Sequence, residues 1–554
     1  MSMTVRVAGE AGQGVLTTGH LLVRSFADLG LHVLATRSYM SRIRGGLNWY
    51  DIRIADAPLW GPARSVELLV ALTDAAAEIL HDGVADGGLV LHSSAEGEAD
   101  IRIDLEAVAE ETGGSALYAN TVAAGAVMAL LGYDLAPLES VLRNEFADKG
   151  DDVVSNNVAC ARKGAELVSS RAGALHAPRP SRRPGRVYDG ATAIGLSAAA
   201  SGVKFVTAYP MTPATATFTR LAAVADECGI IVEQAEDEIA AVNMVCGAAY
   251  AGVPAMTMTS DGGFALMAEG VSLAGMMELP IVILIAQRPA PATGLPTRTA
   301  QQVLLFALRA GHGEFPRAIF TPGTVRQCHD LTRRALETAH AYQTPVLILT
   351  DQFLQDMEQS GDELDTRPRP IDRHIAADAG ADYVRYAATE SGVSPRAIPG
   401  GAAFVVCDSD AHTRDGHITE DLEAHVEQQD KRMRKLRAMA SEALAPERVG
   451  PEDAETLLVT WGSTYGPARE AVELLGESGA SVAMLHFAQV WPLEADAVKK
   501  AIGSPKRVVS VEANCTGQFA TLLRSEGVLG PCELLANYTG LPFTGAEIAE
   551  RIAS

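Results

Sequence analysis

A regular alternation of short apolar strands with helical stretches between residues 187 and 370 is the strongest constraint on the fold of this 554-residue chain. The expected strands have the sequences KFVTAY, IIVEQA, AMTMTS, IVILIA, AIFT and VLILT, and helical stretches of roughly 10–20 residues separate them. Continuous apolar strands joined by helices are typical of a parallel sheet that is covered on both faces. The sequence therefore predicts a doubly wound α/β domain over residues 187–370.

The rest of the chain divides around this domain. Residues 1–175 begin with a strand, a Gly-rich loop, a helix and a second strand, which we interpret as a βαβ unit of another α/β domain. Residues 176–186, HAPRPSRRPGR, predict an exposed linker whose basic run could contact an acidic partner or the chain's own acidic surface. Residues 371–450 predict an irregular connector with a charged helix capped by Thr419. Residues 451–554 predict a smaller α/β domain.

Composition excludes several classes of protein. The formal net charge of −24 argues against nucleic acid or an anionic membrane as the main partner. The longest apolar stretch, Phe264 to Ala286, contains Glu269, Glu278 and Pro280, so a helix followed by a strand explains it better than a membrane span. No signal-peptide pattern precedes the first strand, and we expect a cytoplasmic protein. The seven cysteines form no C-x-x-C pair, which favours scattered thiols over a zinc site or an iron–sulfur cluster.

Four consecutive strands of the middle domain each end in a polar cluster. Tyr209 and Thr212 come after the first strand, Glu238 after the second, Asp261 after the third and Arg288 after the fourth. In an open parallel sheet, ligands bind outside the carboxyl ends of the strands, so these side chains are expected to face one crevice. The pattern predicts a functional site at this edge of the sheet.

Two of these residues also have purely structural explanations. Glu238 begins a helix of otherwise small and apolar residues, where a carboxylate stabilises the helix N-terminus; shielded from water, it could instead exchange a proton near neutral pH. Arg288 follows a buried strand, and its planar guanidinium suits either the carboxylate of a ligand or that of another side chain. The sequence SDGG is similar to half of a thiamine diphosphate–Mg²⁺ site, but no asparagine between Asn243 and Asn514 completes it.

A second candidate site lies near the N-terminus. The loop residues Gly12, Gln13 and Gly14 could let backbone N–H groups approach an anion at the start of the following helix, although a tight turn without a ligand explains them equally well. The segment SRIRGG adds Arg42 and Arg44 in a flexible turn. A crowd of aspartates and histidines between residues 408 and 417 fits no standard metal-ligand spacing, which favours a solvated loop.

Together these motifs resemble the alpha subunits of 2-oxoacid:ferredoxin oxidoreductases. The resemblance rests on YPMTPAT, EDEIAAVNMVCGAAYAG, SDGGFALMAEG, QRPAPATGLPTRT and the C-terminal EANCTGQFA. The N-terminal GEAGQGV and SRIRGG resemble the gamma domain of the same family, fused here ahead of alpha. The architecture is most similar to the alpha subunit of 2-oxoglutarate:ferredoxin oxidoreductase.

The resemblance implies an order of domains and a set of cofactors. We expect a gamma-type α/β domain for coenzyme A and subunit contacts, a pyrimidine-type thiamine diphosphate domain and a C-terminal transketolase-C-like domain. Thiamine diphosphate would lie between this chain and a separate beta subunit that holds Mg²⁺, the diphosphate and a [4Fe–4S] cluster. The expected assembly is an (alpha–beta)₂ heterotetramer that transfers electrons to ferredoxin, and the chain alone would be inactive.

Residue by residue, the resemblance assigns roles at the strand ends. Glu238 matches the glutamate that hydrogen-bonds the aminopyrimidine ring of the cofactor. Thr212 matches the threonine at the substrate carboxylate, and Arg288 matches the arginine that pairs with it. Thr297 is a further candidate for this pocket, and Tyr209 is expected to shape the turn beside the cofactor.

The remaining assignments concern the cofactor and the far end of the substrate. Asp261 and Gly262 of the SDGG motif are assigned to cofactor binding. A pocket for 2-oxoglutarate needs a second cation for the distal carboxylate, which Arg298, Arg42, Arg44 or the beta subunit could provide.

The predicted reaction is therefore the coenzyme A-dependent oxidative decarboxylation of 2-oxoglutarate to succinyl-CoA and CO₂, with electrons passing to ferredoxin. The reverse, carboxylating direction is chemically open. Two alternatives remain: pyruvate or another 2-oxoacid as the substrate, or a coenzyme A- or nucleotide-binding regulatory module without catalysis.

Overall fold

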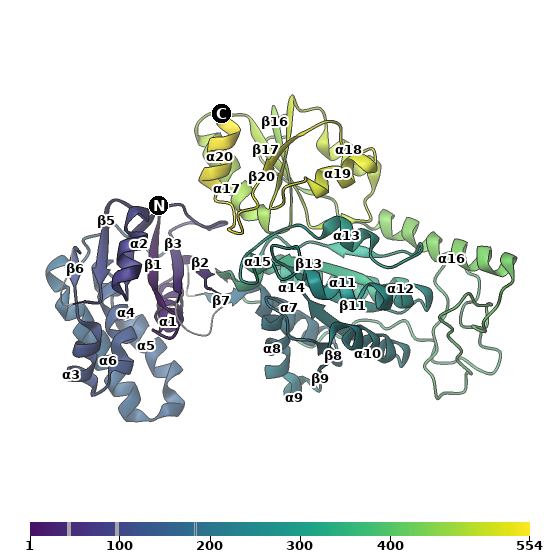
Figure 1. Cartoon of the computed structure of the whole chain (residues 1–554), viewed down its shortest axis with the longest axis horizontal. Helices are drawn as coiled ribbons and strands as arrows, with labels where there is room; N and C mark the ends of the chain where they lie inside the picture. Colours follow the sequence, from purple (N-terminus) through teal and green to yellow (C-terminus); the bar gives the residue numbers. More distant parts are fainter. Residues whose placement is uncertain (41–45, 95–98, 182, 184) are drawn as a thin grey trace. The chain divides into compact units, whose positions relative to one another are not determined.

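The computed structural model describes residues 1–40, 46–94, 99–181, 183 and 185–554. The chain separates into two compact units, shown in sequence colours in Figure 1. The first unit contains Met1–Tyr188, Asp356–Glu363 and Thr544–Glu547, and the second contains Asp189–Gln355, Leu364–Phe543 and Ile548–Ser554. The domain boundaries given above stay predictions, while the multidomain α/β fold class is confirmed.

The first unit contains one sheet and a group of helices. Its strands are β1 (Ser2–Glu10), β2 (His32–Ser38), β3 (Leu47–Ala55), β4 (Val66–Ala71), β5 (Val84–His92), β6 (Ile101–Arg102), β7 (Arg186–Asp189) and β14 (Glu358–Gly361). They are ordered β6-β5-β4-β1-β3-β2-β14-β7. The helices are α1 (Val15–Asp28), α2 (Asp74–Leu80), α3 (Leu105–Gly113), α4 (Ala119–Leu130), α5 (Ala136–Glu145) and α6 (Asp151–Leu167), with the 3₁₀ turns η1 (His81–Gly83), η2 (Ala116–Tyr118), η3 (Ala147–Lys149) and η4 (Ser169–Arg171).

The start of this unit differs from the predicted βαβ unit. Both β1 and β2 pair antiparallel with β3, so β1 and β2 run parallel to each other with β3 between them. The predicted strand, helix and strand form in that order, but β3 lies between the two strands that α1 joins. Hydrophobic periodicity identifies a strand but does not specify its neighbours, and a later strand inserts here.

The second unit contains the large sheet on which the candidate site was predicted. Its strands are β8 (Phe205–Ala208), β9 (Ile231–Gln234), β10 (Ala255–Thr259), β11 (Ile281–Gln287), β12 (Ala318–Phe320), β13 (Val346–Asp351) and β18 (Gln489–Trp491), in the order β18-β12-β13-β11-β10-β8-β9. All neighbours are parallel except β18 and β12. The six strands predicted from the sequence all form.

Helices cover both faces of this sheet. They are α7 (Gly190–Ala200), α8 (Thr215–Ala223), α9 (Ala225–Cys228), α10 (Glu238–Tyr250), α11 (Asp261–Leu266), α12 (Ala268–Met276), α13 (Leu304–Arg309), α14 (Val325–Tyr342) and α15 (Gln352–Asp356). Alternate residues of β11, such as Ile283 and Ile285, pack in one core with α10, α12 and α13. Val282 and Leu284 point to the other face and are also fully buried; α14 lies along β11 and β13 and packs on α7. The predicted doubly wound arrangement is confirmed.

A third sheet forms the C-terminal part of the second unit. Its strands are β15 (Glu447–Val449), β16 (Thr456–Trp461), β17 (Val482–Phe487), β19 (Arg507–Glu512) and β20 (Glu533–Ala536), in the order β15-β17-β16-β19-β20. Only β15 is antiparallel to its neighbour. The helical segments that follow these strands are η5 (Gly462–Thr464), α17 (Tyr465–Glu477), α18 (Ala495–Ile502), α19 (Gln518–Ser525) and α20 (Gly545–Ala553).

An irregular connector leads to the long helix α16 (Leu422–Ser441), drawn in green in Figure 1. The side chain of Asp421 accepts a hydrogen bond from Ala424 N at 2.7 Å and so caps α16. Thr419, the predicted cap, instead accepts a hydrogen bond from Asp421 N at 3.1 Å. The predicted cap was wrong because two competent residues lie two positions apart and the helix starts after the second.

No helix among the described residues is long and apolar enough to cross a membrane.

Charged side chains of α16 are buried rather than solvated. The Nζ atom of Lys431 lies 2.7 Å from Glu278 Oε1, Lys435 pairs with the other oxygen, and all three side chains are inaccessible to water. Burial alone would raise the pKa of Glu278, but the charges of Lys435, Lys431 and Arg385 outweigh it and hold that pKa well below its usual range. This buried ion cluster fixes α16 and the connector to the large sheet.

We expect the substitution Glu278→Gln to lower the melting temperature of the second unit by roughly 10 °C. Removing one partner of a buried ion pair leaves two lysines without a counter-charge, which costs about 3–5 kcal/mol. Differential scanning calorimetry measures the shift. The matched control is Glu455→Gln, which breaks an exposed 2.6 Å ion pair with Lys506 and should change the melting temperature by no more than about 2 °C. Equal losses from both variants would contradict the stabilising role of the buried cluster.

Candidate active site

Glu238 is the first residue of α10, and it is only 2% exposed. The preceding residue, Asp237, caps the helix by accepting a hydrogen bond from Ala240 N at 2.7 Å. Asp237 therefore performs the capping, and Glu238 Oε1 has no hydrogen-bond partner among the residues that the structure describes. This arrangement supports a ligand-directed role for Glu238 over the alternative that it stabilises the helix N-terminus.

The carboxyl of Glu238 packs against Gly263 of α11. A Cβ atom on Gly263 would come within 2.5 Å of Glu238 Oε1 and would also overlap the hydroxyl of Thr259. The hydroxyl oxygens of Thr259 and Ser260 are themselves buried and, in the described part of the chain, unpartnered. Leaving several buried polar atoms unpaired is costly, so their concentration at the end of β10 is typical of a site that receives a polar ligand.

Arg288 joins the ends of two strands at the same edge. It follows β11 directly, it is 7% exposed, and its Nη1 atom donates a hydrogen bond to the carbonyl oxygen of Thr212 at 2.6 Å. Asp261 begins α11 and follows β10, the strand between β11 and β8. Burial raises the pKa of Asp261 to about 7, although the charge of Arg288 acts to lower it. The structure therefore brings together three of the four strand ends that the sequence predicted, and Gly263 joins Glu238 to them.

The other predicted residues of this edge lie on the adjoining loops. Tyr209 is 40% exposed just after β8, and the peptide bond between Thr212 and Pro213 is cis. Thr297 is buried and Arg298 is half-buried, both on the loop that leaves Arg288. Gly262 is exposed beside Gly263, and a Cβ atom there would meet no atom closer than 3.9 Å.

Sequence reasoning missed Asp351, the last residue of β13. Its carboxyl is buried, it accepts hydrogen bonds from the hydroxyl of Ser463 and from Leu354 N, and burial raises its pKa to about 6. The predicted strand VLILT ended one residue too early. Asp351 ends β13, the strand next to β11, so the same rule that found Arg288 would have found it.

The Gly-rich loop of the first unit forms a closed turn. Gly12 and Gly14 both have positive φ values, 96° and 78°, and Gly14 precedes the first residue of α1. The side-chain oxygen of Gln13 accepts a hydrogen bond from Glu10 N at 2.7 Å, so this amide closes the loop on itself. The loop therefore has the geometry of a tight βα turn, and its coenzyme A role stays a prediction.

Arg42 and Arg44 lie outside the described residues. Among the residues that are described, including the stretch from 408 to 417, no three histidine, cysteine or acidic side chains gather in a metal-binding arrangement.

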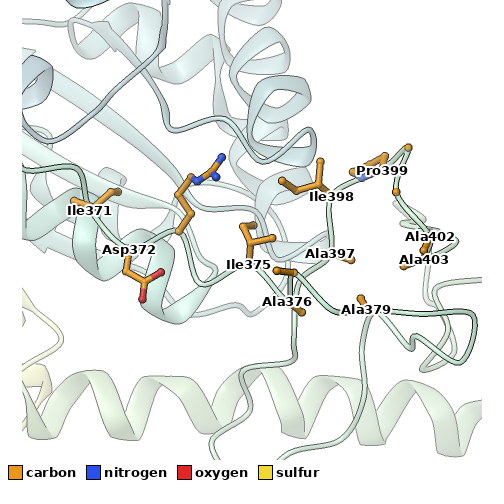
Figure 2. Close-up of a pocket in the computed structure, with 14 residues that line it drawn as sticks. Ile371, Asp372, Ile375, Ala376, Ala379, Ala397, Ile398, Pro399, Ala402 and Ala403 are labelled. Atoms are coloured by element: carbon orange, nitrogen blue, oxygen red, sulfur yellow. The ribbon is translucent and has the colours of Figure 1, made fainter.

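A pocket of about 720 Å³ lies at the opposite end of α10 from Glu238. It is formed by the connector segments 371–379 and 397–403, which carry mostly alanine, glycine and isoleucine (Figure 2). Arg396 donates a hydrogen bond to Ala249 O in the last turn of α10, and Arg373 donates one to Gly252 O two residues beyond the helix, so connector arginines bind carbonyls at this end of α10. A helix of 13 residues is about 20 Å long, which separates this pocket from the polar strand ends.

The fold and the site together define a class of protein. A doubly wound sheet has the character of a pyrimidine-type thiamine diphosphate domain when a buried glutamate at its carboxyl edge leaves one oxygen without a partner, as Glu238 does in the described part of the chain. The family model described as pyruvate flavodoxin/ferredoxin oxidoreductase, thiamine diphosphate-binding, matches residues 197–431. Those described as pyruvate ferredoxin/flavodoxin oxidoreductase and as the transketolase C-terminal domain match residues 4–167 and 447–531.

Proteins that are similar to this chain over nearly its whole length identify its family. The alpha subunit of 2-oxoacid:ferredoxin oxidoreductase 1 from Aeropyrum pernix is 30% identical over 99% of this chain and 96% of its own length. The KorA subunit of the Mycobacterium tuberculosis 2-oxoglutarate oxidoreductase is 27% identical over 100% of this chain and 91% of its own. The solved structure of 2-oxoglutarate:ferredoxin oxidoreductase from Magnetococcus marinus, with 2-oxoglutarate, coenzyme A and succinyl-CoA bound, has a TM-score of 0.93 and 30% identity, covering 100% of this chain and 99% of that one.

The chain belongs to the alpha-subunit family of 2-oxoacid:ferredoxin oxidoreductases. It is therefore one subunit of a multi-subunit oxidoreductase, and the predicted family is confirmed.

We expect Gly263→Ala to abolish thiamine diphosphate-dependent turnover without unfolding the chain. The added methyl group would displace the Glu238 carboxyl, and losing a positioned proton-transfer group lowers the rate about 10²–10⁴-fold. The measurement is kcat of the assembled enzyme together with far-UV circular dichroism. The control is Gly247→Ala on the exposed side of α10, where a Cβ atom meets nothing within 4 Å. Retention of full activity by Gly263→Ala would contradict the proposed position of Glu238.

Proposed function

We propose that this chain is the alpha subunit, with a fused gamma domain, of an enzyme that converts 2-oxoglutarate and coenzyme A to succinyl-CoA and CO₂ and transfers the electrons to ferredoxin. The substrate proposal is supported by the Magnetococcus marinus structure, which contains 2-oxoglutarate, coenzyme A and succinyl-CoA, and by the name of the Mycobacterium tuberculosis relative.

The observation that carries this proposal is the buried Oε1 atom of Glu238, which has no hydrogen-bond partner among the described residues. Thiamine diphosphate, when bound, supplies the electron sink that decarboxylation of a 2-oxoacid requires. The Oε1 atom of Glu238 is free to share a proton with a ring nitrogen of the aminopyrimidine, and Gly263 leaves the carboxyl room to do so. The residues present therefore fit the pyrimidine half of this cofactor.

Arg288 and Thr212 would position the substrate. The guanidinium of Arg288 is buried at the strand ends, where a planar donor binds a carboxylate strongly. Its hydrogen bond to the carbonyl oxygen of Thr212 fixes its orientation before substrate arrives. Thr297 adds a hydroxyl from the following loop.

The other half of the cofactor site would come from a beta subunit. The sequence lacks the asparagine that would complete a metal site after SDGG, and its seven cysteines have no iron–sulfur spacing. We propose that a partner chain holds Mg²⁺, the diphosphate and a [4Fe–4S] cluster, in an (alpha–beta)₂ assembly that reduces ferredoxin.

Reconstitution tests this division of labour. The purified chain is expected to show no 2-oxoacid-dependent reduction of a viologen dye, and addition of the beta subunit, thiamine diphosphate, Mg²⁺ and coenzyme A should restore it. A panel of 2-oxoglutarate, pyruvate and a branched 2-oxoacid then gives kcat/KM for each. Activity of the isolated chain would refute the shared site, and a preference for pyruvate would refute the proposed substrate.

We expect the KM for the 2-oxoacid to rise with pH above about 7. With a pKa of about 7, Asp261 is neutral below that pH and ionised above it, and the ionised carboxylate competes with the substrate for Arg288. The effect would reach up to roughly tenfold in KM per pH unit. The negative charge of the Asp351 carboxyl also contributes to the raised pKa of Asp261. Asp261→Asn should flatten the KM profile between pH 6 and 8, and an unchanged slope in this variant would count against the assignment.

A further inference from the structure

A loop of the C-terminal domain contacts the segment that carries Arg298. This loop, Asn537–Leu541, follows β20. The carbonyl oxygen of its Gly540 accepts a hydrogen bond from Thr299 N at a distance of 3.0 Å. A Cβ atom on Gly540 would lie 3.1 Å from Cβ and 3.4 Å from Cγ of Arg298. With φ at +89°, Gly540 has a backbone conformation that side chains rarely adopt. The absence of a side chain here allows the loop to approach the stem of Arg298.

The loop itself is held rigidly. The side-chain oxygen of Asn537 accepts hydrogen bonds from the hydroxyl of Thr539 at 2.8 Å and from Thr539 N at 3.1 Å. The side-chain nitrogen of Asn537 donates to Leu541 O at 2.9 Å, and Asn537 N donates to Glu512 O at 3.1 Å. The position of Gly540 is therefore fixed by the C-terminal sheet.

The segment with Arg298 is also tied to Arg288. Leu295 N donates to Pro289 O at 3.0 Å, and Arg298 N donates to Leu295 O at 3.1 Å. These two hydrogen bonds close a compact loop that begins directly after Arg288 and ends at Arg298. The side-chain nitrogen of Gln302 donates to Arg288 O at 3.0 Å, on the far side of the same loop. Both arginines are thus at the ends of one braced segment.

We propose that the loop Asn537–Leu541, through Gly540, positions Arg298 to bind the distal carboxylate of the substrate, and so makes the C-terminal domain the element that selects dicarboxylic over monocarboxylic 2-oxoacids. Two cations at a fixed separation favour a ligand whose two carboxylates have a matching separation, and fixing them beforehand reduces the entropy lost on binding. The inference rests on the proposed function, because it assumes that Arg288 binds the carboxylate next to the 2-oxo group. Gly540 would be a positioning residue, with no contact to the substrate.

The test uses Gly540→Ala in the assembled alpha–beta enzyme. The methyl group should move Arg298, and we expect the KM for 2-oxoglutarate to rise at least tenfold while kcat and the KM for coenzyme A change less than twofold. The ratio of kcat/KM for 2-oxoglutarate to that for pyruvate should fall at least tenfold.

The matched control is Gly479→Ala in the same domain. Gly479 has nearly the same φ, +84°, but a Cβ atom there meets nothing within 4 Å, so this variant reproduces the backbone strain without the contact. It should leave the substrate ratio unchanged. Equal losses for both 2-oxoacids in Gly540→Ala, or the same shift in Gly479→Ala, would show a merely structural role and overturn the proposal.

Two more variants cover the case in which Gly540→Ala fails to fold. Thr539→Val removes the hydroxyl that donates to Asn537 and accepts from Leu541 N, which loosens the loop without a steric clash, and it should raise the KM for 2-oxoglutarate selectively. Arg298→Met should lower the same substrate ratio. An unchanged ratio in Arg298→Met overturns the inference while leaving the oxidoreductase function intact, whereas an assembled enzyme without activity on any 2-oxoacid overturns both.

Discussion

One oxygen of the Glu238 carboxyl is held away from water without a hydrogen-bond partner in the described protein, and the candidate site depends on this constraint. A buried polar atom left unpaired destabilises the folded state, so the surroundings must hold it in place. Asp237 caps α10, and the small α11 residue Gly263 approaches the carboxyl directly. The parallel sheet then places Arg288 and Thr212 at the same edge. Each of these features holds the Glu238 carboxyl in place until a ligand forms a hydrogen bond with its Oε1 atom.

The opposite end of α10 is fixed by an unrelated set of charges. Arg396 of the connector binds a carbonyl in the last turn of this helix and Arg373 binds one just beyond it, where positive charge is favourable for the helix dipole. The buried ion cluster of Glu278 with Lys431 and Lys435 holds α16 on the same side of the chain's second unit. A helix fixed at its far end cannot slide along its axis, so Glu238 is kept in register with Gly263.

The sequence predicted the large sheet, and the grouping of polar residues at its carboxyl edge, because both follow from short-range patterns. Continuous apolar strands identified β8 to β13, and the rule about carboxyl ends located Thr212, Asp261 and Arg288 without reference to any partner strand. The features that the sequence did not reveal depended on long-range pairing or on small shifts: the insertion of β3 between β1 and β2, the cap at Asp421, and Asp351 one residue beyond the predicted strand. The burial of Lys431 and Lys435 was also missed, since a basic helix end is usually solvated.

The buried ion cluster has a consequence for how this protein can be divided and recombined. Glu278 belongs to the sheet domain, while its partners Lys431 and Lys435 lie more than a hundred residues further along the chain. Evolution can exchange one of these segments only together with the other, because a mismatched pair would bury uncompensated charge. Residues from Glu278 through Lys435 therefore form one unit of inheritance, although the connector within this stretch has almost no regular structure. Chimaeras between relatives should keep their junctions outside this stretch.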